Sequence, residues 1–236
     1  MNIEIDLHTH TLANPHAYST MYENIMEAKA KGLKGIAVTD HGPDMEDSPH
    51  FWHFNCIRGI PQEAYGLKIL KGIEANIINK DGEIDARPPF INKLDFVIVS
   101  YHPPVYNPKT PEELETAYLN ALDNPCVKII GHLDRGPFEI DYEKVILKAK
   151  ENNVAIELNR HSLNLEATYK ERLIKIAQIC NRLKVPVTID SDAHFCSEVG
   201  NVGIVFDLLE EINFDKTLIL NTDINKTFKF LNIQED

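Results

Sequence analysis

The sequence predicts an α/β protein whose parallel strands close into a barrel of βα units. Short apolar, β-branched runs recur along the chain, and helical stretches separate most of them. Several runs, such as VAIEL and DFVIVS, are apolar almost throughout, which is typical of parallel strands covered on both faces. The segment after the first run, LHTH, lacks the glycines of a phosphate-binding loop. It therefore disfavours an open, doubly wound sheet, which remains the alternative architecture.

Chain length sets the number of strands. An eight-stranded βα barrel usually needs roughly 250 residues, so the 236 residues of this chain leave room for about seven or eight strands. We expect a single domain spanning residues 1–236, because no repeat, low-complexity tract or linker divides it. The seven expected strands are residues 3–7, 35–39, 68–73, 96–100, 128–131, 154–158 and 186–190.

Helices are expected between these strands. Thr110 and Glu113 form a capping box, with Pro111 at the first helical position. Ser19 is a candidate N-cap for another helix, which Gly32 would end. The remaining candidates repeat apolar residues at spacings of three and four. The expected helices are residues 20–31, 111–123, 141–152, 166–183 and, more weakly patterned, 198–212.

Composition excludes several classes of protein. With 24 basic and 36 acidic side chains the formal net charge is −12, which argues against nucleic acid held on a broad basic surface. There is no apolar run of 18 residues and no secretory pattern at the start, so we expect a cytoplasmic protein without membrane contact. The four cysteines are scattered without a CxxC motif, and we expect free thiols.

Histidines and carboxylates gather where the expected strands end. Side chains at positions i and i+2 of a strand point to the same face, so His8 pairs with His10, and Asp192 pairs with His194. In a parallel barrel the carboxyl ends of all strands meet at one mouth. The expected cluster contains His8, His10, His16, His41, Glu74, His102, His132, Asp192 and His194.

This donor set predicts a metal site. Imidazole and carboxylate groups are the ligands of zinc and similar divalent cations. Nine protein ligands are too many for one cation, since zinc takes four or five, and they are enough for two or three. Glu74, the acidic residue at the end of its strand, suits a bridging position between two cations.

The motifs DLHTHT, HAYST, TDHG, GIEAN, SYHPP, GH and SDAH, in this order from Asp6 to His194, resemble the PHP (polymerase and histidinol phosphatase) family. The resemblance is strongest to its small stand-alone phosphatases that hold three metals. It implies a distorted seven-stranded (βα)7 barrel and a single metal-dependent phosphoesterase domain. Zinc is the metal that the resemblance favours, with manganese and iron as alternatives.

The resemblance also implies a ligand set for each of three divalent cations. By position, the first cation would be held by His8, His10, Glu74 and Asp192, the second by Glu74, His102 and His132, and the third by His16, His41 and His194.

The activity implied is hydrolysis of a small phosphomonoester, such as histidinol phosphate or another phosphorylated metabolite, by a hydroxide that bridges two metals. We expect this reaction to depend on Glu74, Asp192 and His194. Two alternatives stay open, a phosphodiesterase or 3′–5′ exonuclease and a non-catalytic metal-binding module. The sequence shows no basic run with interleaved aromatic residues, which a nucleic-acid groove would need.

Further residues are candidates for supporting roles. Arg160 follows the sixth strand and is expected to face the mouth and grip a phosphate, and Arg135 is a second candidate. His161 would face away from the mouth if the strand continued through it. Three aspartates next to or near the predicted ligands are candidate acceptors for their imidazoles. They are Asp6, Asp40 and Asp190.

Overall fold

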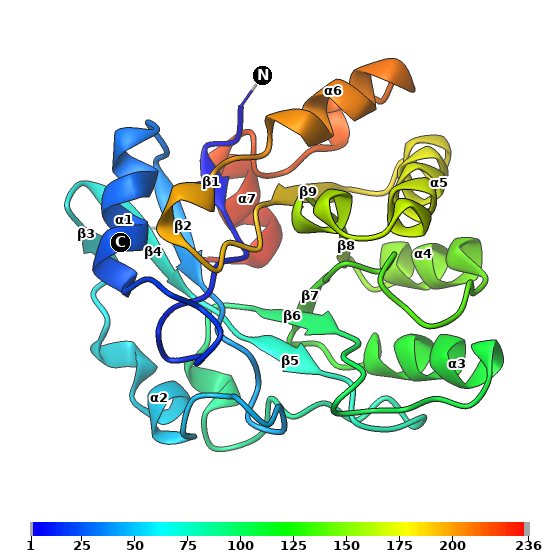
Figure 1. Cartoon of the computed structure of the whole chain (residues 1–236), viewed down its shortest axis with the longest axis horizontal. Helices are drawn as coiled ribbons and strands as arrows, with labels where there is room; N and C mark the ends of the chain where they lie inside the picture. Colours follow the sequence, from blue (N-terminus) through cyan, green and yellow to red (C-terminus); the bar gives the residue numbers. More distant parts are fainter. Residues whose placement is uncertain (1, 234–236) are drawn as a thin grey trace.

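The computed structural model of the chain describes residues 2–233 and shows central strands with helices around them (Figure 1). Within these residues the strands pair as two sheets. The orders are β1-β2-β4-β3 and β5-β6-β7-β8-β9. The strands are β1 (Ile5–Asp6), β2 (Gly35–Val38), β3 (Glu63–Ala64), β4 (Leu67–Lys71), β5 (Glu74–Asn76), β6 (Val97–Ser100), β7 (Val127–Ile130), β8 (Ala155–Asn159) and β9 (Val187–Asp190).

The predicted α/β class with parallel strands is confirmed. Every pair of neighbouring strands is parallel except β3 and β4. Each of the seven expected ranges overlaps an observed strand, and β3 and β5 are additional. Strand β3 arises from a hairpin whose turn residues Tyr65 and Gly66 both have positive φ, and Tyr-Gly is not among the usual sequence signals for such a turn.

Strand β5 continues the direction of β4 after a two-residue interruption at Gly72 and Ile73. A side chain at position 72 would bring a Cβ atom within 2.8 Å of Thr39 Cγ2, so only glycine lets the backbone pass there. The new pairing partner of β5 is β6. This change of partner divides the strands into two sheets.

Single parallel bridges connect the two sheets at both seams. Thr9, just beyond β1, pairs with Ala193, just beyond β9, and His41, just beyond β2, pairs with Glu74 in β5. The bridges lie just beyond the carboxyl ends of β1, β2 and β9 and at Glu74, the first residue of β5. They therefore bring the end of β1 beside the end of β9, and the end of β2 beside the start of β5.

The helices cover the outside of the sheets, with α3, α4 and α5 stacked along one flank in Figure 1. Thr110 caps α3 and Pro111 occupies its first turn, as predicted. The N-cap of α1 is Thr20 instead of Ser19, because the Ser19 hydroxyl accepts the Cys196 N–H at 2.8 Å. The helices are α1 (Met21–Ala30), α2 (Trp52–Asn55), α3 (Pro111–Ala121), α4 (Tyr142–Glu151), α5 (Ala167–Leu183), α6 (Gly203–Glu211) and α7 (Ile224–Leu231).

Helix α7, which the sequence pattern did not reveal, completes the inner core. Its residues Ile224 and Phe228 pack in one cluster with strand residues such as Ile5, Ile98 and Ile129. Histidines such as His8, His41 and His132 lie beyond the carboxyl ends of the strands. No helix in residues 2–233 combines the length and apolar character needed to cross a membrane.

Candidate metal centre

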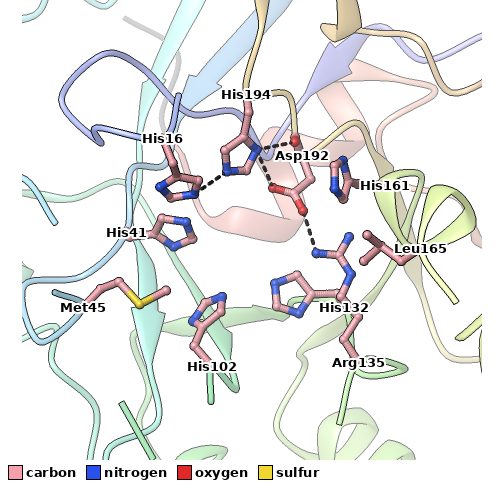
Figure 2. A pocket seen from close by; sticks show the side chains of 10 residues that line it. All are labelled: His16, His41, Met45, His102, His132, Arg135, His161, Leu165, Asp192 and His194. Carbon is pink, nitrogen blue, oxygen red and sulfur yellow. Dashed lines mark hydrogen bonds and ion pairs between the residues drawn. The ribbon is translucent and has the colours of Figure 1, made fainter. Parts of the chain in front are cut away.

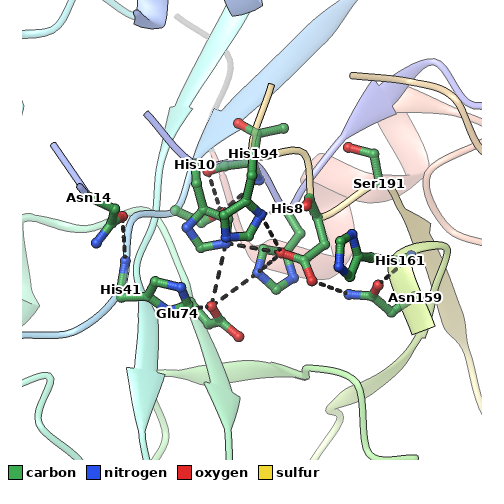
Figure 3. Close-up of polar contacts among 12 residues, drawn as sticks. His8, His10, Asn14, His41, Glu74, Asn159, His161, Ser191 and His194 are labelled. Carbon is green, nitrogen blue, oxygen red and sulfur yellow. Dashed lines mark hydrogen bonds and ion pairs between the residues drawn. The ribbon is translucent and has the colours of Figure 1, made fainter. Parts of the chain in front are cut away.

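Glu74 lies at the centre of the predicted ligands, and Figure 3 shows His8, His10 and His41 around it. Its Oε2 atom is 3.3 Å from His8 Nε2, 3.5 Å from His10 Nε2 and 2.8 Å from His41 Nδ1. Its Oε1 atom is 2.7 Å from His132 Nε2 and 3.3 Å from His102 Nε2. One carboxylate thus faces five imidazoles that follow four different strands.

The surroundings of Glu74 keep it ionised although it is completely buried. Burial raises the pKa of the carboxyl group, but the imidazoles of His8, His102 and His41 outweigh that effect and hold this pKa well below its usual value. A buried carboxylate needs a compensating positive charge, and the nitrogen neighbours of Glu74 therefore indicate a site for a cation.

The remaining predicted ligands approach from β9 and from the loop after β1. Asp192 Oδ1 lies 3.1 Å from His10 Nε2, and His194 Nε2 lies 2.8 Å from His16 Nε2. Asp192 and His132 have positive φ values of 54° and 25°. Such backbone strain in non-glycine residues is concentrated at functional sites.

The donor atoms fit divalent cations. His8 Nδ1 lies 2.7 Å from Glu157 Oε1 and donates to it, so the other nitrogen of a neutral His8 directs a lone pair at Glu74. Among the described residues, His8 Nε2, His41 Nδ1 and Glu74 Oε2 are buried and, although they approach one another closely, none makes a contact with hydrogen-bond geometry. Positive charge between these atoms satisfies all three, and proteins supply it there with a proton or a metal ion.

The side chains of the cluster form three compact groups, each of which has the geometry to hold an ion. They are His8 with His10 and Glu74, His41 with Glu74 and His102, and His10 with His41 and His194. Two groups share Glu74, which agrees with a bridging role. All three differ from the expected sets. The first lacks Asp192, the second contains His41 where His132 was expected, and the third contains His10 where His16 was expected. His16 Nδ1 contacts Asp47.

Glu157, which the sequence analysis does not single out, lies in the apolar run VAIEL, and its carboxylate holds two histidines of this site in position. Its Oε2 accepts the His132 backbone N–H at 2.7 Å and the Asn159 side-chain amide at 2.9 Å, while its Oε1 accepts from His8. It thereby orients histidines from two strands. The sequence feature that could have identified this role is a carboxylate within an otherwise apolar strand.

We expect Glu157→Gln to weaken metal binding about 10–100-fold, the usual cost of losing an acceptor behind a ligand histidine. The amide keeps the shape of the side chain, but its NH₂ group repels one of the donors that Glu157 now accepts. Competition with a chromophoric chelator measures the affinity. Glu143→Gln, at a surface pair with Arg182, is the control, and equal affinities in the two variants would contradict this role.

The three aspartates expected to support the ligand imidazoles do not contact them. Asp40 accepts from the Thr11 N–H and hydroxyl and faces His53 Nε2 at 3.1 Å. Asp6 and Asp190 instead accept backbone N–H groups of neighbouring loops and strands. That expectation was wrong.

A pocket of about 380 Å³ opens above the cluster (Figure 2). Six of the nine predicted ligands line it, together with two apolar and two basic side chains. Its lining consists of His16, His41, Met45, His102, His132, Arg135, His161, Leu165, Asp192 and His194.

The two candidate arginines are placed differently. Arg135 lines the pocket and donates to Ser162 Oγ, Asp192 Oδ2 and Asn159 Oδ1 at 2.8, 2.9 and 2.6 Å. Arg160 is not part of the lining, because its guanidinium pairs with Glu198 at 3.1 Å. His161, expected to face away, lines the pocket. Strand β8 ends at Asn159 and a 3₁₀ turn begins at His161, so strand alternation does not extend to it.

Together, the fold and the site define an α/β protein with groups of histidine and carboxylate side chains, each able to hold a metal ion, near the carboxyl ends of its strands. The PHP domain family matches residues 6–161, and the PHP-associated family matches residues 172–218. The chain belongs to the PHP family.

Known proteins resemble the chain over nearly its whole length. A protein named probable phosphatase from Acetivibrio thermocellus is 42% identical over 231 residues, covering 98% of this chain and 96% of the relative. The histidinol phosphate phosphatase of Lactococcus lactis, solved with zinc, L-histidinol and phosphate, superposes with a TM-score of 0.59 at 18% identity, covering 90% and 94% of the two chains. A chain in an archaeal ribonuclease P structure with mature tRNA superposes with a TM-score of 0.63 at 18% identity, covering 97% and 90%.

Proposed function

We propose that the protein is a metal-dependent phosphatase that hydrolyses small phosphomonoesters. The observation that carries this is the buried Glu74 carboxylate with imidazoles on both of its oxygens. Three of these imidazoles line the pocket that also presents Arg135; they belong to His41, His102 and His132. The relative named probable phosphatase, at 42% identity over nearly the whole chain, supports the same activity.

We assign the cations to the three ligand sets implied by the motifs, with Glu74 shared by two of them. Zinc is the first metal to test, followed by manganese and iron, since the ligand types suit all three. Bound divalent cations would neutralise phosphate oxygens and favour ionisation of water near neutral pH. Around them, Glu157 and the other acceptors hold the imidazoles in position.

Arg135 is the group of this chain that we assign to the phosphate. Its guanidinium has five N–H donors, three of its hydrogen bonds go to protein atoms, and the remaining donors are available to a ligand in the pocket. Asp192 and Asn159 fix the plane of the guanidinium, so little freedom is lost when an anion binds.

The pocket favours a small substrate. A cavity of about 380 Å³ admits a phosphate with a compact leaving group, and the net charge of −12 opposes a polyanionic strand. Histidinol phosphate is the first metabolite to assay, followed by sugar and nucleotide monophosphates. Phosphodiester cleavage is the second candidate, because the ribonuclease P chain shows that this fold also occurs beside RNA.

We also infer that the two sheets act as one distorted seven-stranded barrel in a domain that spans the chain. Only Gly72 and Ile73 separate β4 from β5. Counting these two as one strand and β3 as a hairpin addition leaves seven parallel strands. The Thr9–Ala193 and His41–Glu74 bridges support closure at the two seams.

Hydrolysis of p-nitrophenyl phosphate and of bis(p-nitrophenyl) phosphate by the zinc- and manganese-loaded protein tests the activity. We expect turnover of the monoester. Preference for the diester would favour the phosphodiesterase, and metal binding without turnover of either ester or of any metabolite above would favour a binding module.

Arg135→Ala should raise KM for the monoester about 10–100-fold, because hydrogen bonds to a charged group contribute about 1.5–3 kcal/mol each. Arg135→Lys should recover only part of this loss, since an ammonium cannot replace the planar fork. Initial-rate kinetics measure the effect, with metal content determined in parallel. Arg160→Ala is the matched control, and its KM should stay close to that of the unmodified protein. A larger effect at Arg160 than at Arg135 would reverse this assignment.

A further inference from the structure

A chain of hydrogen bonds runs from a buried carboxylate outside the ligand cluster to one of the ligand histidines. Asp85 Oδ2 accepts from Asn76 Nδ2 at 2.5 Å, and Asn76 Oδ1 lies 2.6 Å from His102 Nδ1. His102 Nε2 in turn lies 3.3 Å from Glu74 Oε1. Asp85 and Asn76 are both completely buried. None of the expected ligand sets includes Asp85 or Asn76.

Asp85 is held as an acceptor. Besides the Asn76 side chain, it accepts the backbone N–H groups of Asn76 at 2.8 Å and of Asp44 at 3.0 Å. Burial raises the pKa of Asp85 to about 6, so it remains ionised at neutral pH and cannot donate. Gly42 makes room for it, since a Cβ atom there would lie 2.2 Å from Asp85 Oδ1.

The acceptor character of Asp85 decides which way the Asn76 amide points. Asn76 Nδ2 faces Asp85 and, at 3.3 Å, the Gly42 carbonyl, both of which are acceptors. The amide oxygen must therefore face His102, and His102 Nδ1 must carry the proton. A neutral His102 ring then has its one proton on Nδ1, so its Nε2 lone pair faces Glu74 Oε1.

We propose that Asp85 is a positioning residue that sets the tautomer of His102 through Asn76 and so keeps His102 Nε2 free for a cation beside Glu74. The inference deepens the proposed function, because it concerns the same metal site. The tautomer itself is a property of the metal-free protein, so it can be measured whether or not the protein is a phosphatase.

Asp85→Asn tests the proposal. One amide oxygen would then face three N–H donors, and the Asn76 side chain is expected to turn its nitrogen towards His102. In ¹⁵N-edited NMR spectra of the metal-free protein, the His102 signal, identified by its loss in His102→Gln, should change from the Nδ1–H to the Nε2–H form. Zinc affinity of one site, measured by chelator competition, should fall about 10–100-fold.

The double variant Asp85→Asn/Asn76→Asp exchanges the amide and the carboxylate. The carboxylate at position 76 accepts from His102 Nδ1, and the amide at position 85 donates to it, so the Nδ1–H form and most of the zinc affinity should return. Asp95→Asn is the control, because Asp95 also accepts a backbone N–H, from Lys71 at 2.7 Å, but among the described residues it has no hydrogen bond to Asn76 or His102.

An unchanged His102 tautomer in Asp85→Asn would overturn the proposal, as would a double variant no better than the single one. If Asp85→Asn does not fold, as judged by circular dichroism, Asn76→Ala decides, because it removes the link itself. Retention of the pure Nδ1–H form in that variant would overturn the proposal, and a mixture of tautomers would support it. If these results support the relay while no ester is hydrolysed, only the proposed function fails.

Discussion

Glu74→Gln should lower kcat for phosphomonoester hydrolysis by about 10³-fold or more and reduce the bound metal by at least one equivalent. The amide has the size of the carboxylate but lacks its charge. It therefore cannot balance the charge of the cations that the five surrounding imidazoles would help to bind. Loss of Lewis-acid stabilisation by even one cation costs several kcal/mol in the transition state, and each 1.36 kcal/mol is tenfold in rate.

Steady-state kinetics and elemental analysis of the same samples measure both effects. Glu198→Gln is a suitable control, because it removes a carboxylate near the site, paired with Arg160, that is outside the cluster. Full metal content together with full activity in Glu74→Gln would refute the whole ligand assignment.

Removal of the metals by a chelator should abolish activity and lower the melting temperature. A ligand present at 100 times its Kd stabilises the folded state by about 2.7 kcal/mol, which for a chain of this size corresponds to about 5–10 °C for each site. Zinc or manganese should restore both properties. Burial lowers the pKa of His8 and of His41, but the carboxylates beside them outweigh it and raise both. Binding should therefore weaken as pH falls, beginning above the usual histidine value of about 6.5, because histidine binds metal only in its neutral form.

Differential scanning calorimetry and activity assays before and after chelation provide the measurement, with Glu157→Gln as a variant that should need more metal for the same recovery. A melting temperature that is independent of metal, with activity that survives chelation, would contradict a metal-dependent mechanism.

The parts of the site that sequence could predict are those that depend on position along a strand. His8 and His10 are two residues apart, and Glu74 and His132 directly follow apolar runs, so their convergence follows from the parallel arrangement alone. The resemblance to a known family added the expected ligand sets. The structure then placed these residues within a few ångströms of one another.

The parts that sequence could not predict depend on contacts between distant segments or on where a strand stops. Glu157 meets His8 across 149 positions, and no local pattern reports that pairing. His161 faces the pocket because β8 ends at Asn159 and a 3₁₀ turn begins at His161, a change of backbone conformation that the apolar pattern does not report. Arg160 donates to Glu198, a residue 38 positions away. Because of this contact, Arg135 lines the pocket and Arg160 does not.

Anomalous X-ray diffraction from crystals of the zinc-loaded protein, recorded on both sides of the zinc edge, tests the central claim most directly. We predict anomalous peaks on both sides of the Glu74 carboxylate, within coordination distance of His8 and His10 on one side and of His102 and His132 on the other. Absence of zinc at Glu74, or zinc bound only elsewhere on the surface, would contradict the account.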